Sequence, residues 1–149
     1  MMETFKPRGP GIWCLFTGLL WMACQSRGHD PRGVRAAMEE YDRLILHMNV
    51  DSIAMLYAPE GELGDIARGR DSIRHFLARF RNIRVLSQAS GSDTVLIGGD
   101  TAWQLGTYHQ RDILPSGDSV SVHGTFKARW VWIYPGGWHI RRMDTKPIP

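Results

Sequence analysis

The side chains best suited to chemistry lie close to the C-terminus. Asp144 follows a segment with Trp138 and Ile140, and a carboxylate held on an apolar surface can act as a general base on a C–H bond or on water. Arg142 could bind a carboxylate ligand through two parallel hydrogen bonds. The alternatives are that Asp144 forms a salt bridge with Arg142 or Arg141, or that it lies in solvent at the end of the sheet.

Three tryptophans form a second group of candidates. Trp103, Trp130 and Trp132 could form an aromatic wall for a flat ligand. They could equally pack in the hydrophobic core, where we expect Trp130 to lie at least in part. Trp132, near the end of a predicted strand, could instead form the rim of a pocket or a dimer contact.

Other kinds of chemistry find little support in the sequence. Cys14 and Cys24 are the only cysteines, so the folded domain has no disulfide and no cysteine metal site. The histidines lack the i, i+4 pair of a helical metal site, and no Gly-x-Ser-x-Gly, Rossmann or Walker motif is present. We therefore predict no metal and no cofactor. The net charge of +3, spread along the chain, argues against nucleic acid as a partner.

The first part of the chain has the pattern of an export signal. Lys6 and Arg8 precede an uncharged apolar stretch, residues 11–23, which has the length of a signal-peptide hydrophobic region. It is shorter than the roughly 20 residues that a membrane anchor needs. The site at Ala23 and Cys24 resembles a bacterial lipoprotein cleavage box, in which the cysteine becomes the lipidated N-terminus.

We therefore expect a signal peptide over residues 1–23, a tether over 24–32 and one domain over 33–149. The protein would be exported to the periplasm, or anchored to a bacterial membrane through a lipid on Cys24. Plain secretion and an uncleaved N-terminal anchor are the alternatives.

Helical patterns come before strand patterns in the domain. Apolar residues recur at helical spacing from Val34 to Met48, behind an Asp30-Pro31 start, and shorter helices are expected over residues 52–57 and after Gly69. The segment between them, residues 58–69, reads as a loop with a short strand near Leu63. Strands are predicted over residues 85–89, 94–97, 101–113, 119–134 and 138–145. Helices followed by long strands predict an α+β fold with a mostly antiparallel sheet.

Alternation along the strands predicts which side chains face the helices. Five residues of the two long strands are placed on the helix side, namely Trp103, Leu105, Phe126, Ala128 and Trp130. On the last strand we expect Ile140 to face Trp130, with Arg142 and Asp144 following on the same side. A register slip of one residue would reverse the face of a strand.

Several short strings, in this order, resemble the SnoaL-like branch of the nuclear transport factor 2-like superfamily over roughly residues 34–146. They are Gly69-Arg70-x-x-Ile73-x-x-Phe76, Gly99-Asp100-Thr101-Ala102, Gly124-x-Phe126-x-x-x-Trp130 and Gly137-Trp138-x-Ile140-x-x-x-Asp144. The resemblance implies a cone-shaped roll, in which a curved sheet wraps around three N-terminal helices with a pocket at the open end. Homodimers are common in this superfamily, so a homodimer is expected.

By the same resemblance, five positions match the pocket lining of the family: Tyr41, Trp103, Trp130, Arg142 and Asp144. Loop residues Glu62 and Asp65 match positions near its mouth. These matches favour an envelope protein that binds a small, mainly apolar ligand without established catalysis. One alternative is a lyase or isomerase in which Asp144 is the general base and Tyr41 donates a hydrogen bond to an oxyanion. The other is a non-catalytic dimerisation or interaction module.

Overall fold

The computed structural model describes residues 29–149. This part of the chain has three helices, α1 (Pro31–Leu46), α2 (Val50–Leu56) and α3 (Arg70–Ala78). Its strands are β1 (Tyr57–Leu63), β2 (Ala67–Arg68), β3 (Arg84–Gly98), β4 (Thr101–Ile113), β5 (Ser119–Ile133) and β6 (Gly137–Pro147). The predicted α+β class is confirmed, and the segment expected to be mainly loop contains β1 and β2. No helix in residues 29–149 is long and apolar enough to cross a membrane.

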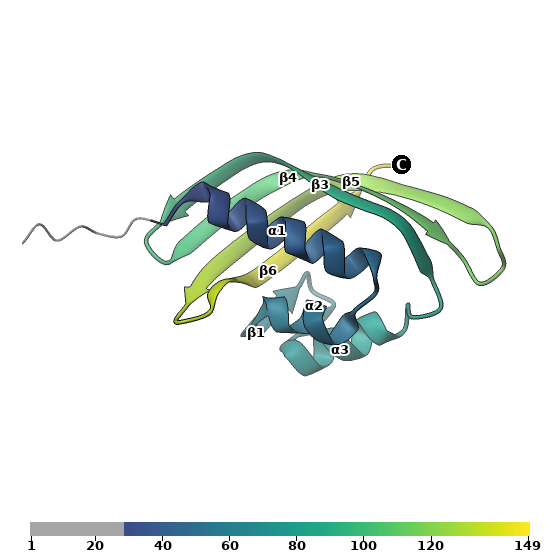
Figure 1. Cartoon of the computed structure of the whole chain (residues 1–149), viewed down its shortest axis with the longest axis horizontal. Helices are drawn as coiled ribbons and strands as arrows, with labels where there is room; N and C mark the ends of the chain where they lie inside the picture. Colours follow the sequence, from purple (N-terminus) through teal and green to yellow (C-terminus); the bar gives the residue numbers. More distant parts are fainter. Residues whose placement is uncertain (1–28) are drawn as a thin grey trace, which may run out of the picture.

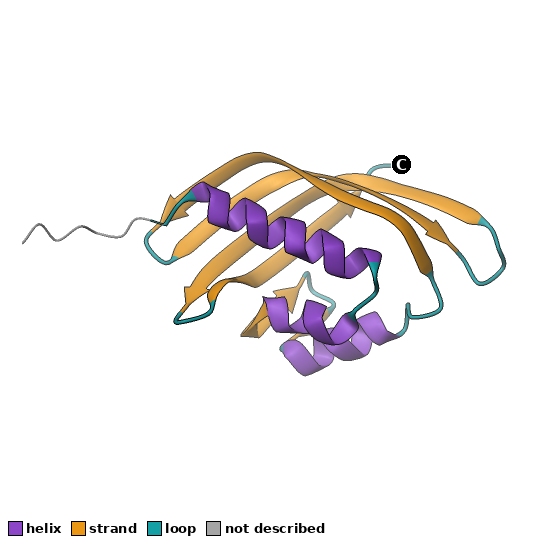
Figure 2. Ribbon diagram, viewed as in Figure 1, coloured by secondary structure: helices purple, strands orange, loops and turns teal. Residues whose placement is uncertain are grey.

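The strands form one curved sheet in the order β2-β1-β6-β5-β4-β3. All neighbouring pairs are antiparallel except β1 and β6, which are parallel. Helix α1 lies along the concave side of the sheet, and α2 and α3 lie together beside β1 (Figures 1 and 2). The sheet therefore bends over α1, which agrees with the predicted cone-shaped roll.

The helices begin where the sequence provides caps. The Asp30 carboxylate accepts a hydrogen bond from the Arg32 amide at 2.8 Å, and Pro31 occupies the first turn of α1. The Asn49 side chain accepts a hydrogen bond from the Ser52 amide at 3.2 Å at the start of α2. The buried side of α1 carries Val34, Met38, Leu44 and Ile45, as the helical spacing predicts.

Strand β3 is one continuous strand, so the predicted break at residues 90–92 is wrong. It pairs with β4 along its whole length, with two irregularities, between Val85 and Ser87 and between Ser92 and Thr94. Bulges bend a strand without ending it. Serine and glycine therefore mark a bend here rather than a turn.

The face predicted for Trp103 and Leu105 is wrong. Ala102 pairs with Trp130, and Trp103 pairs with Arg129, so Trp103 and Leu105 lie on the outer face and are 38% and 41% exposed. The inner positions of β4 are the small or polar Ala102 and Gln104, which are fully buried beneath large side chains from β5. Phe126, Ala128 and Trp130 lie on the helix side, as predicted.

The face predicted for Arg142 and Asp144 is also wrong. Ile140 pairs with Trp130, as expected, but Arg142 pairs with Arg129, so Arg141 is an extra residue in β6. This bulge reverses the alternation beyond it. Met143 consequently enters the core at 2% exposure, while Arg142 and Asp144 lie on the opposite face.

His29, the first described residue, packs against the sheet. The imidazole of His29 stacks on Trp132 with 4.3 Å between ring centroids, and its Nε2 lies 2.9 Å from the Asp100 carboxylate. Residues 29–32, expected in the tether, thus include a side chain packed on the domain. The predicted signal peptide and Cys24 lie outside the described residues.

Candidate ligand-binding site

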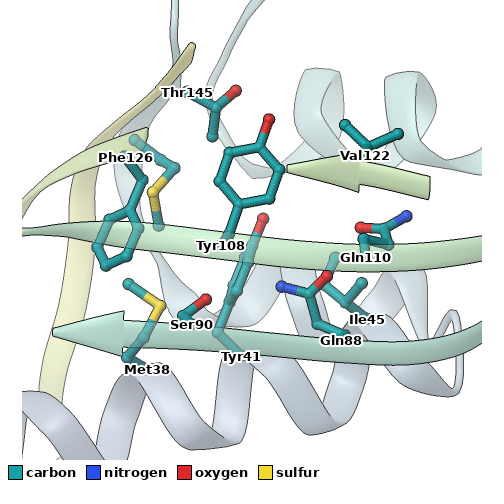
Figure 3. Close-up of a pocket in the computed structure, with 11 residues that line it drawn as sticks. Met38, Tyr41, Ile45, Gln88, Ser90, Tyr108, Gln110, Val122, Phe126 and Thr145 are labelled. Atoms are coloured by element: carbon teal, nitrogen blue, oxygen red, sulfur yellow. The ribbon is translucent and has the colours of Figure 1, made fainter. Parts of the chain in front are cut away.

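A cavity of about 240 Å³ lies between α1 and the concave face of the sheet. Each of α1, β3, β4, β5 and β6 contributes side chains to its wall (Figure 3). The apolar part of the wall consists of Met38, Ile45, Val122, Phe126 and Met143. The polar part consists of Tyr41, Gln88, Ser90, Tyr108, Gln110 and Thr145. This division suits a ligand with an apolar body and one or two polar groups.

Two tyrosines project into this space from opposite layers. Tyr41 comes from α1 and Tyr108 from β4, with Met38 and Phe126 on one side of them and Gln88 and Gln110 on the other (Figure 3). Burial raises the pKa of Tyr41 to about 12 and raises the pKa of Tyr108 as well. Both phenols are therefore protonated at neutral pH and can donate a hydrogen bond.

A glycine makes room for the Tyr108 ring. Gly124 pairs with Tyr108 across β4 and β5, and a Cβ atom at Gly124 would lie 2.9 Å from Cε1 of that ring. A similar Cβ at Gly106 would lie 2.8 Å from the Phe126 ring. The absence of a Cβ atom at these two glycines thus leaves room for the two aromatic rings.

Helix α1 is attached to β3 by one carboxylate at the edge of the cavity. The Asp42 carboxylate accepts hydrogen bonds from the Ser90 amide at 2.7 Å, the Ser90 hydroxyl at 2.7 Å and Gln88 Nε2 at 2.9 Å. The bond from Nε2 fixes the orientation of the Gln88 amide. Gln88 Oε1 is buried and has no hydrogen-bond partner among residues 29–149. A ligand that donates a hydrogen bond would satisfy this oxygen.

Of the five residues predicted to line the pocket, only Tyr41 does so. Trp130 is fully buried behind the cavity, where its indole N–H donates to Gln104 Oε1 at 2.9 Å. Trp103 lies on the outer face, with Lys127 Nζ at 5.0 Å and Arg129 Cζ at 5.6 Å from its ring centroid. Trp130 therefore has a core role, and Trp103 a role in cation–π packing on the surface.

Arg142 and Asp144 belong to a separate ionic cluster. Arg142 donates to Asp144 at 2.8 Å, to Glu62 at 2.9 Å and to Asp65 at 2.8 Å. Hydrogen bonds to the three carboxylates raise the pKa of Arg142, and its guanidinium lowers the pKa of Glu62. The salt-bridge alternative for Asp144 is what the structure shows. Asp144 and Tyr41 do not share a cavity, and Arg142 has its donors engaged by the chain's own carboxylates.

Sequence reasoning did not select Tyr108, Gln88 or Gln110 as site residues. Tyr108 and Gln110 occupy even positions of β4. The predicted alternation, with Trp103 and Leu105 on the helix side, puts the even positions on the outer face. The signal present in the sequence is Gly124 inside a predicted strand, because a strand glycine often marks the close approach of a bulky group. Gln88 gives no comparable signal.

The residues described, 29–149, contain no group of three or more His, Cys, Asp or Glu side chains arranged to hold a metal ion. Among these described residues, those that line the cavity include no acidic, basic or histidine side chain. Its polar groups are phenols, amides and hydroxyls. Such groups can orient a ligand by hydrogen bonds, and they include no general base with an ordinary pKa near neutrality.

Comparisons with solved structures find the same fold in several proteins. A protein from Xanthomonas campestris described as a calcium/calmodulin dependent protein kinase II association domain has a TM-score of 0.71 and 21% identity, covering 81% of this chain and 89% of that one. A ketosteroid isomerase-like protein from Erwinia carotovora has a TM-score of 0.70 and 16% identity, with coverages of 79% and 95%.

A third similar structure is a nuclear transport factor 2-like protein with a cystatin-like fold from Novosphingobium aromaticivorans. Its TM-score is 0.66 and its identity 20%, with coverages of 80% and 82%. No protein-family model matches the sequence, and no curated protein matches it significantly. At these identities the likeness shows the fold, and the function has to be argued from the site.

Proposed function

We propose that this protein binds a small, mainly apolar ligand in the cavity between α1 and the concave face of the sheet. The observation that carries the proposal is the cavity itself, of about 240 Å³, with an apolar wall and a few convergent polar groups. The motif strings quoted above support a place for the chain in the SnoaL-like branch of the superfamily.

The size of the cavity limits the ligand. An engineered apolar cavity of about 150 Å³ binds benzene, so a space of about 240 Å³ suits a molecule somewhat larger than benzene. Burying its apolar body would contribute roughly 25 cal/mol for each Å² removed from water. The unpartnered Gln88 Oε1 favours a ligand that donates a hydrogen bond, such as an alcohol or an amine.

Binding is favoured over catalysis by the chemistry of the wall. The enzyme alternative needs a carboxylate base beside Tyr41, and Asp144 is instead engaged by Arg142 on the other face of the sheet. Without that base, Tyr41 retains the ability to donate a hydrogen bond to a ligand oxygen or nitrogen. Its role in the proposal is therefore to orient the ligand.

The proposal is tested with 1-octanol, which has an apolar chain and one hydroxyl. We expect it to raise the melting temperature of the protein and to bind in a saturable manner in calorimetry. Val122→Phe, which adds a ring inside the cavity, should abolish this binding while the protein stays folded. Val131→Phe is the matched control, because Val131 lies on the outer face of the same strand. Equal binding by the wild type and Val122→Phe would contradict the proposal.

We also propose that the protein acts outside the cytoplasm, tethered by a lipid on Cys24. The support is the charged start, the apolar stretch over residues 11–23 and the cleavage-box pattern at Ala23 and Cys24. The mass of the N-terminal peptide of the mature protein tests this directly. A diacylated or triacylated Cys24 is expected, and an intact Met1 would contradict the proposal.

A further inference from the structure

A second cavity, of about 280 Å³, adjoins the first and contains a buried carboxylate. Gln110 and Ile45 line both cavities. The wall of the second cavity is otherwise apolar except for Asp112, and its remaining residues are Met48, Leu77, Phe80, Ile83 and Val85. The two spaces thus lie on either side of Gln110, under α1 and beside α3.

Asp112 has an unusual environment for an acidic residue. It is only 7% exposed, whereas aspartate is almost never fully buried unless it is paired. Within residues 29–149, its hydrogen-bond partner is the neutral side-chain amide of Gln110, whose Nε2 lies 2.9 Å from each carboxylate oxygen. Among residues 29–149, no Lys, Arg or His lies within salt-bridge distance of Asp112, and none lines the second cavity.

This environment leaves the carboxylate incompletely compensated. A carboxylate has about four lone-pair sites, and the single amide nitrogen occupies only part of that capacity. Burying a charge is costly unless a cation or several hydrogen bonds accompany it. In the described part of the chain, no positively charged donor reaches this carboxylate.

We propose that the ligand is a primary amine, bound as its ammonium ion, with the ammonium group against Asp112 in the second cavity and the apolar body extending past Gln110 into the first cavity. This inference rests on the proposed function and makes it more specific. Gln110 positions the carboxylate from the wall shared by the two cavities, and the apolar lining accepts the hydrocarbon part. An ammonium group offers three donors, which matches an acceptor-only carboxylate.

The test compares two ligands of the same length, octylammonium and 1-octanol, by calorimetry at neutral pH. The wild type should bind octylammonium about tenfold or more tightly than 1-octanol, as expected for a close charge pair away from water. Asp112→Asn keeps the shape of the side chain and removes the charge, so it should lose this preference.

Asp93→Asn is the matched control, since Asp93 is exposed in β3. It should retain the preference for the amine.

Equal binding of the two ligands by the wild type would overturn the inference and leave the proposed function standing. Failure of both ligands to bind would contradict the proposed function. A preference lost equally in Asp112→Asn and Asp93→Asn would reflect the overall charge of the protein and would also overturn the inference. The wild-type comparison decides the matter even if Asp112→Asn does not fold.

Discussion

Replacing Asp42 by alanine should weaken the attachment of α1 to β3 at the edge of the ligand site. Three hydrogen bonds from Ser90 and Gln88 end on this carboxylate. A hydrogen bond to a charged group contributes about 1.5–3 kcal/mol to stability. Asp42 and Ser90 are only partly buried, so water can replace part of the interaction. We therefore expect Asp42→Ala to lower the free energy of unfolding by about 2–4 kcal/mol.

Urea unfolding followed by circular dichroism measures this change, with the slope against denaturant checked for two-state behaviour. Glu39→Ala is the matched control, because Glu39 is an exposed acid on the same helix, and its effect should stay within about 0.5 kcal/mol. In a double-mutant cycle, Asp42→Ala and Ser90→Ala should show a coupling of about 1 kcal/mol or more. A loss below about 0.5 kcal/mol for Asp42→Ala, or additive effects in the cycle, would refute the reasoning.

Three further predictions concern residues that the sequence placed in the pocket or near its mouth. Trp130→Phe should cost about 2–4 kcal/mol in a denaturant titration, because it leaves a void and deprives Gln104 Oε1 of its donor. Trp103→Ala should leave the affinity for 1-octanol unchanged in calorimetry, since Trp103 lies on the outer face. The pKa of Glu62 is lowered by its hydrogen bond to Arg142, so this pair stabilises the protein above the usual pKa of 4.5 and less as the pH falls. Glu62→Gln should therefore be less stable than the wild type at neutral pH, with a gap that closes on acidification.

The helices could be predicted because their signals are local. Asp30 and Asn49 cap helices with their own side chains, and Val34 and Met38 recur at helical spacing on the buried side. Such contacts involve residues a few positions apart. The predicted order of helices and strands is therefore close to the observed one.

The inner face of β4 could not be read from hydrophobicity. Ala102 and Gln104 lie on the core face beside the large Trp130 side chain, while Trp103 packs against charged groups on the outer face. The apolar residues of this strand therefore mark the wrong face. Only the pairing of Ala102 with Trp130, a contact across two strands, reveals this.

The predicted positions of Arg142 and Asp144 are wrong because β6 contains one extra residue. The bulge at Arg141 reverses the alternation of β6, which brings Met143 into the cavity wall and takes Asp144 out of it. No residue type in this segment of the sequence predicts the bulge. Tyr41 was placed correctly because it lies on a helix, where the 3.6-residue period is not interrupted.

The most direct test of the central claim is to locate the ligand with methyl NMR. Met38 and Met143 line the cavity, whereas Met55 is 51% exposed on α2, so a sample labelled at its methionine methyl groups contains both probes and a control. On titration with 1-octanol, we predict saturable shifts and intermolecular contacts at the methyl groups of Met38 and Met143, with Met55 unchanged. Shifts confined to Met55 and other exposed groups, with no ligand contact at Met38 or Met143, would contradict the account.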